Sequence, residues 1–376
     1  AYFTVRLTGD VALGAAAAIF GITVGTAAAA LYLWLYNRIK GDGITARQIA
    51  ESPEREEGTV AVKGLMLISL SVAAASLSSN IPLIADAVTV KRSLSGLDYE
   101  ALSGIRHIYA AGYSVSDISV SQLPTFLYGV KSKAYTLYNL VPSFVSVLAV
   151  GSVPVISACF AAKDWERLNI NINSALKLSG VISFPAGVGI IVLNSRITAL
   201  LYGGAYPSGA ADMAALFGAA ALFAGPAVLL TTVLQAVGRH NRALVNIAIG
   251  TVIKFCVNLT VGIESVNING AALGTLAFYA AVCLLNIFSL IGIKIKPDIT
   301  GSIIKPFAAA AVCGAAAYAV SLVSRGNAVT LFAILVAAFV YFIMIFSLKM
   351  LTESDFNLLT KSETVVKFCR KHRIIS

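Results

Sequence analysis

Long uninterrupted apolar segments constrain this chain more than any other feature of its sequence. They recur along its whole length, and each has about 20 residues or more, the length at which an α-helix crosses a hydrocarbon core of about 30 Å. Only 12% of the 376 residues are charged, whereas soluble globular proteins carry about 25%. Since so few polar groups cannot cover a soluble particle, the sequence predicts an all-α, polytopic membrane helix bundle.

Charged and turn residues between the apolar segments predict about nine transmembrane helices. The predicted spans are residues 10–37, 62–90, 123–150, 172–200, 210–237, 243–263, 268–292, 304–324 and 328–350. Several are longer than a perpendicular crossing requires, so we expect tilted helices or helices that extend beyond the bilayer.

Lysine and arginine are distributed unevenly between alternate connections. One set of connections carries nineteen of the 28 basic residues and the other carries eight, while Lys254 lies inside a predicted span. Because basic residues concentrate on the cytoplasmic side, the richer set and the C-terminal tail are predicted to be cytoplasmic in a multi-pass plasma-membrane protein. The net charge of +10 then reflects topology and contact with lipid headgroups, and nucleic-acid binding is not expected.

The sequence contains no recognisable pattern for catalysis or for metal binding. The three histidines are far apart, and the five cysteines form no CxxC pair and are expected to behave as small buried hydrophobes. Neither a Walker A sequence nor a GxSxG motif occurs. We therefore predict a protein that is not an enzyme and that uses no metal and no cofactor.

Polar side chains inside the predicted spans are few, and such residues are costly in a bilayer. A rise of about 1.5 Å per residue places Asp86, Asn258 and Thr275 at similar depth in the outer third of the membrane. Lys254 lies one turn deeper on the Asn258 face of its helix. We predict an Asp86–Lys254 ion pair with Asn258 and Thr275 as hydrogen-bonding neighbours. It is either a coupling site, responsive to protonation, a cation or an anionic substrate, or a purely structural pair.

A group of basic residues is predicted on the outer side of the membrane. Its members are Lys91, Arg92, Arg106, Lys131 and Lys133. These side chains either hold the phosphate or pyrophosphate of an anionic headgroup by charge-assisted hydrogen bonds, or belong to an ordinary solvated connection.

Several short motifs follow one another in a fixed order between about residues 60 and 280. They are Leu83-Ile84-Ala85-Asp86-Ala87-Val88, Asn139-Leu140-Val141-Pro142, Phe184-Pro185-Ala186-Gly187, Leu234-Gln235-Ala236-Val237-Gly238 and Asn269-Gly270-Ala271-Ala272-Leu273-Gly274-Thr275. In these motifs the chain resembles the multidrug/oligosaccharidyl-lipid/polysaccharide (MOP) exporter superfamily, in particular its stage V sporulation protein B and polysaccharide-biosynthesis group. The resemblance implies a MATE-like carrier of 14 helices, with two six-helix bundles and two further helices, which works by alternating access.

The resemblance also implies a division of the chain, in which five helices of the first bundle are missing. The expected parts are the last helix of the first bundle (1–37), a cytoplasmic linker (38–61), the second six-helix bundle (62–292), two additional helices (293–351) and a basic cytoplasmic tail (352–376). A chain that begins with Ala1 instead of Met agrees with numbering that starts inside a longer protein.

The function implied by the resemblance is a flippase or exporter for a lipid-linked oligosaccharide or cell-wall precursor. Its expected partners are that lipid-linked saccharide or another anionic lipid, the bilayer, and proteins of wall synthesis. A cation-coupled multidrug antiporter and a non-transporting scaffold for wall or spore assembly are the alternatives. Related lipid II flippases place a sodium site on the helices that carry Asp86, Asn258 and Thr275. Because an ammonium group would repel sodium, Lys254 suggests a fixed charge in place of the ion.

Overall fold

The computed structural model describes the greater part of the chain, and in that part all regular secondary structure is helical. The described residues are 9, 11–41, 58–59, 62, 66, 82–84, 86–90, 92–96, 119–203, 211–263, 266–293, 295–298, 300–324, 326–348, 350, 352 and 355. Eight helices within these ranges are long and apolar enough to cross a membrane, which confirms the predicted fold class. The second of the nine predicted spans, residues 62–90, lies mostly outside the described residues.

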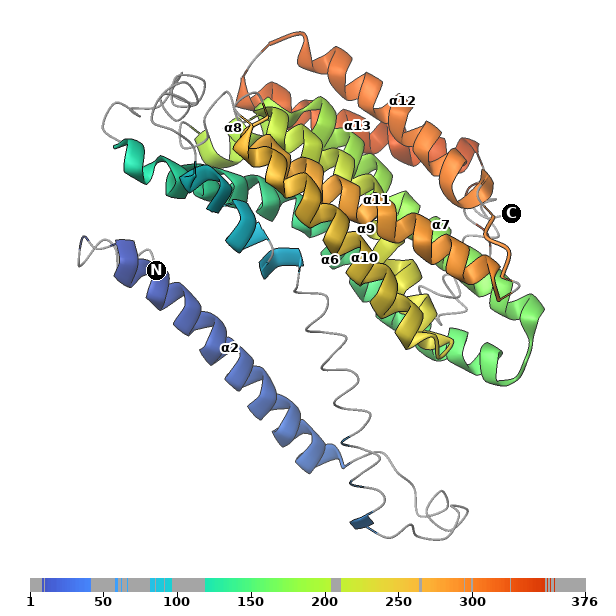
Figure 1. Ribbon diagram of the computed structural model, residues 1–376. Coiled ribbons are helices and arrows are strands. Elements are labelled where there is room, and N and C mark those ends of the chain that lie inside the picture. Colours follow the sequence, from blue (N-terminus) through green and yellow to red (C-terminus); the bar gives the residue numbers. More distant parts are fainter. Residues whose placement is uncertain are drawn as a thin grey trace. The chain divides into compact units, whose positions relative to one another are not determined.

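The chain divides into two units, residues 1–69 and 70–376, which we describe separately. The first contains α2 (Val11–Lys40; Figure 1), whose apolar side chains are almost all exposed within the unit. The hydroxyls of Thr23 and Thr26 donate to carbonyls one turn earlier, so these polar groups are satisfied inside the helix, as a hydrocarbon environment requires. Arg38 lies over the ring of Trp34, an aromatic–basic pair typical of a membrane interface.

The second unit is a helix bundle centred on α9 (Figure 1). Its long helices are α6 (Leu123–Ala161), α7 (Trp165–Val192), α9 (Ala211–Ala236), α10 (His240–Asn258), α11 (Asn269–Ile291), α12 (Lys305–Ser321) and α13 (Asn327–Ser347), and a short α8 (Asn194–Tyr202) follows α7. Helix α9 packs against α6, α7 and α11, whereas α10 packs on α11, and α12 packs on α13 and α7.

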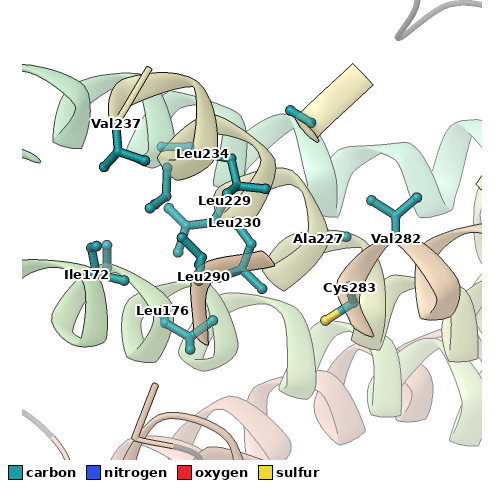
Figure 2. Packing of buried hydrophobic residues seen from close by; sticks show 14 of the residues in the cluster. Ile172, Leu176, Ala227, Leu229, Leu230, Leu234, Val237, Val282, Cys283 and Leu290 are labelled. Carbon is teal, nitrogen blue, oxygen red and sulfur yellow. The ribbon is translucent and has the colours of Figure 1, made fainter. Parts of the chain in front are cut away.

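Close packing, rather than removal of apolar surface from water, holds helices together in a bilayer. Helices α7 and α9 meet at Gly187 and Gly218, where a Cβ on either glycine would lie 2.8 to 2.9 Å from the carbonyl oxygen of the other. A cluster of buried apolar residues lies further along the same two helices. Figure 2 shows it as a cluster that includes Ile172, Leu176, Leu229, Leu230, Leu234, Val282 and Leu290, contributed by α7, α9 and α11.

Two helix boundaries differ from the predicted spans. Helix α6 continues beyond residue 150 to Ala161, and its 39 residues exceed the length of one perpendicular crossing. Helix α7 begins at Trp165 instead of 172, because the Asp164 side chain caps it by accepting from the Arg167 backbone N–H at 3.1 Å. The polar first turns of α7 gave no hydropathy signal. The predicted span 172–200 is also interrupted at Leu193, where α7 ends and α8 follows.

Polar side chains attach the α12–α13 pair to α7 near both of its ends. The Asn173 amide donates to the Lys296 carbonyl at 3.1 Å, and Lys177 Nζ lies 2.8 Å from the buried Asp355 carboxylate after α13. Toward the other end, Arg196 Nη1 donates to the Ser324 carbonyl at 2.6 Å. These bonds fix the two helices beside the bundle.

Candidate functional site

The Asp86 carboxylate is the centre of a fully buried polar cluster. Lys131 Nζ lies 2.7 Å from Asp86 Oδ2, and Lys254 Nζ lies 3.0 Å from the same oxygen. Asn258 Nδ2 donates to the other oxygen, Oδ1, at 2.8 Å. The lysine side chains are only 4% and 2% exposed. We refer to Asp86, Lys131, Lys254 and Asn258 as the Asp86 cluster.

Three helical segments bring these side chains together. Lys254 and Asn258 are four residues apart on α10, so both point from one face of that helix, and both are buried. Lys131 comes from the third turn of α6. Asn258 Nδ2 also reaches Thr89 Oγ1 at 3.1 Å, one turn after Asp86 in the helical segment 86–90. The amide therefore orients the carboxylate from one side while the two ammonium groups bind it from the other.

The Asp86 cluster has two ammonium groups and one carboxylate, a formal surplus of one positive charge when all are ionised. Aromatic rings surround that surplus. Lys131 Nζ is 5.2 Å from the ring centroids of both Tyr128 and Tyr135, and Lys254 Nζ is 6.0 Å from that of Phe278. Ring faces attract cations and partly replace the hydration that burial removes.

The predicted Asp86–Lys254 ion pair is present, and Asn258 bonds to the same carboxylate. Thr275 is buried, but its hydroxyl donates to the Ala271 carbonyl at 3.0 Å. The nearest acceptor for a threonine hydroxyl in a membrane helix is the backbone carbonyl one turn earlier, which explains why Thr275 does not bond to the Asp86 cluster. A role of these four residues in coupling stays a prediction.

The predicted outer basic group requires one correction. Lys131 does not lie in an exposed connection, because α6 already begins at Leu123 and turns this side chain inward to Asp86. The spacing Tyr128-x-x-Lys131-x-x-x-Tyr135, which places a ring on either side of the ammonium, was the available signal. Of the remaining members, Lys133 is half-buried with its ammonium 5.8 Å from the Tyr202 ring centroid, Arg92 is exposed, and Lys91 and Arg106 lie outside the described residues.

A second feature of the bundle is an apolar cavity of about 480 Å³ between α7 and the α12–α13 pair. Pro185 and Gly189 line it from α7, and Gly314 lines it from α12. Tyr341 from α13 also lines it, but its hydroxyl is engaged, since it donates to the Val181 carbonyl at 3.1 Å. The walls therefore suit a hydrocarbon chain. Elsewhere in the described ranges, no three His, Cys, Asp or Glu side chains are close enough to hold a metal ion.

The chain is similar to a known protein family and to two bacterial proteins. The MatE family model matches residues 107–260. The chain is 27% identical to the uncharacterized membrane protein YabM of Bacillus subtilis (strain 168), over 73% of this chain and 47% of that protein. It is 26% identical to the lipid II flippase MurJ of the same organism, over 38% of this chain and 26% of that protein. The chain thus spans about half the length of YabM, or less in the case of MurJ.

Among solved structures, a MOP superfamily transporter from Pyrococcus furiosus is similar to this chain. The two share 16% sequence identity with a TM-score of 0.36, over 76% of this chain and 70% of the other.

Proposed function

Because the chain belongs to the MOP exporter superfamily, we propose that it forms part of a plasma-membrane carrier for a lipid-linked saccharide such as a cell-wall precursor. In this proposal residues 1–37 are the last helix of a first bundle and 38–61 are a cytoplasmic linker. Residues 62–292 are the second bundle, 293–351 the two additional helices and 352–376 a cytoplasmic tail. The named relative MurJ, a lipid II flippase, supports this substrate class.

The observation that carries the proposal is the apolar cavity between α7 and the α12–α13 pair. Its volume of about 480 Å³ lies within the range of about 300–1,000 Å³ found for ligand pockets. The lining includes Ala317, Ala337 and Ile345 and offers almost no hydrogen-bonding group, so it excludes a free sugar but accommodates a hydrocarbon chain. A carrier that moves a lipid-linked molecule needs such a surface for the lipid part.

We assign the coupling role to the Asp86 cluster. Its surplus positive charge would be neutralised by an anionic group of the substrate, such as a phosphate, which competes with Asp86 for the ammonium of Lys131 or Lys254. Both lysine side chains are buried in the described conformation, so this contact requires the cluster to open. Opening and closing then links substrate binding to the arrangement of α6, α10 and the segment around Asp86.

The decisive experiment reconstitutes the full-length protein in proteoliposomes and follows a fluorescent disaccharide linked through pyrophosphate to a polyprenyl chain. We expect protein-dependent movement of the labelled lipid between leaflets, measured by quenching with an impermeant reductant. Export of cationic dyes that is driven by a cation gradient of opposite direction, without movement of the labelled lipid, would instead establish the multidrug antiporter. Movement of neither probe, together with retention of wall-synthesis proteins, would establish the scaffold.

Transport is expected to be independent of sodium. Two ammonium groups already occupy the space beside Asp86 Oδ2, at 2.7 and 3.0 Å, so a sodium ion there would be repelled by both. The initial rate should therefore stay within about twofold when sodium is replaced by choline at constant ionic strength. A requirement for sodium, or a cation found beside Asp86, would contradict the assignment of fixed charges to this position.

A further inference from the structure

One face of α6 is polar along almost its whole transmembrane length. The side chains of this face are exposed or half-buried: Thr125, Tyr128, Ser132, Tyr135, Thr136, Asn139, Ser143 and Ser146. At 3.6 residues per turn they fall within an arc of about 100°. The neighbouring arc carries exposed apolar side chains such as Leu140, Phe144 and Val147. We refer to the polar residues as the α6 stripe.

The α6 stripe is long enough to cross the membrane. From Thr125 to Ser146 the helix rises about 31 Å at 1.5 Å per residue, close to the thickness of about 30 Å of a hydrocarbon core. A single polar residue in a membrane helix requires no explanation beyond local packing. A continuous row over the full depth indicates a surface that meets something other than lipid.

The exposed faces of other helices in this unit differ from the α6 stripe. On α10 the exposed positions include Val252 and Phe255, on α11 Leu284 and Phe288, and on α13 Phe339. These faces are suited to hydrocarbon. The contrast indicates that lipid contacts the exposed faces of the other helices. The α6 stripe instead faces a water-filled path or a polar ligand.

This surface is neutral, although a cation lies directly behind it. Lys131 Nζ sits between the Tyr128 and Tyr135 rings of the α6 stripe but is directed inward to Asp86. The residues of the α6 stripe itself are hydroxyl-bearing, aromatic or amide side chains. A charged group would be recognised by opposite fixed charge, which this face lacks, so the matching ligand is polar and neutral.

We infer that the α6 stripe binds the saccharide of the lipid-linked substrate through its hydroxyl groups; this inference rests on the proposed function. The hydroxyls of Ser132, Thr136 and Ser143 already donate to carbonyls four residues earlier, at 2.7 to 2.9 Å. Their oxygen lone pairs therefore accept from sugar hydroxyls, while the Asn139 amide both donates and accepts. The rings of Tyr128 and Tyr135 offer flat faces for the C–H surface of a sugar ring.

Cysteine accessibility in the full-length protein tests this inference without relying on transport. In a background whose native cysteines are replaced by alanine, Asn139→Cys and Ser143→Cys are compared with Phe144→Cys and Val147→Cys, which lie at similar depth on the apolar arc of α6. We expect an impermeant charged methanethiosulfonate to label the first two at least tenfold faster. The labelled lipid-linked disaccharide should slow this reaction about tenfold, whereas polyprenyl pyrophosphate without sugar should not.

The outcomes separate failure of the inference from failure of the proposed function. If Asn139→Cys and Ser143→Cys are as unreactive as the two controls, the α6 stripe faces lipid or packs against protein, and the inference is overturned. Equal protection by the sugar-free lipid would also overturn it, while leaving the proposed function intact. Transport of the labelled lipid in the same proteoliposomes reports on the proposed function alone.

Discussion

Replacing Asp86 by alanine is expected to lower the free energy of unfolding by about 3–5 kcal/mol, because it leaves two buried ammonium groups without their carboxylate. The same change should abolish transport. Thermal unfolding in detergent and recovery of a monodisperse peak in size-exclusion chromatography measure the first effect. Asp212→Ala, which removes an exposed aspartate from the first turn of α9, is the matched control and should lower the free energy of unfolding by at most about 1 kcal/mol. Unchanged stability of Asp86→Ala would show that the described ion pairs do not form in the membrane.

A triple variant separates a structural role of the Asp86 cluster from a coupling role. Asp86→Leu combined with Lys131→Met and Lys254→Met replaces all three charges by apolar side chains, and such replacements of buried ion pairs are often neutral or stabilising. We expect the triple variant to regain the stability that Asp86→Ala loses but to remain inactive in transport. Wild-type transport by the triple variant would reduce the cluster to a structural element.

Filling the apolar cavity with Gly189→Leu is expected to reduce transport of the polyprenyl-linked probe at least tenfold without loss of stability. A Cβ at Gly189 would meet no atom within 4 Å, and Gly189 lines the cavity, so the added side chain takes up cavity space. Leucine also favours the helical conformation over glycine by up to about 1 kcal/mol. A tenfold loss of affinity corresponds to about 1.4 kcal/mol of binding free energy.

Gly151→Leu on α6 is the control for this substitution. Gly151 is also a helical glycine with no atom within 4 Å of an added Cβ, but it does not line the cavity. Initial rates should therefore fall for Gly189→Leu only, and the loss should be smaller for probes with shorter hydrocarbon chains. Equal rates for both variants with every chain length would rule out the cavity as the lipid site.

Part of the candidate site was predictable from residue spacing. Lys254 and Asn258 share a helix face because they are four residues apart, and helix rise places Asp86 at similar depth, so their meeting could be anticipated. Lys131 was assigned to the outer basic group instead of to Asp86, because a lysine near the end of a helix ordinarily extends to the membrane surface. The predicted span already begins at residue 123, so only the rotation of α6 in the structure shows that this side chain is directed to Asp86.

No pattern in the sequence predicted the apolar cavity. Its lining residues, such as Gly189, Gly314 and Tyr341, are far apart in the chain and are ordinary residues of membrane helices. The sequence by itself determined the helical class and the approximate spans. The free energy of transferring each residue from water to the bilayer depends mainly on the residue itself and little on its neighbours in the fold. The contact of Lys131 with Asp86, the apolar cavity and the exposed face of α6 were decided only by the tertiary structure. They depend on how each helix is rotated and which helix lies beside it, and contacts between distant segments set both.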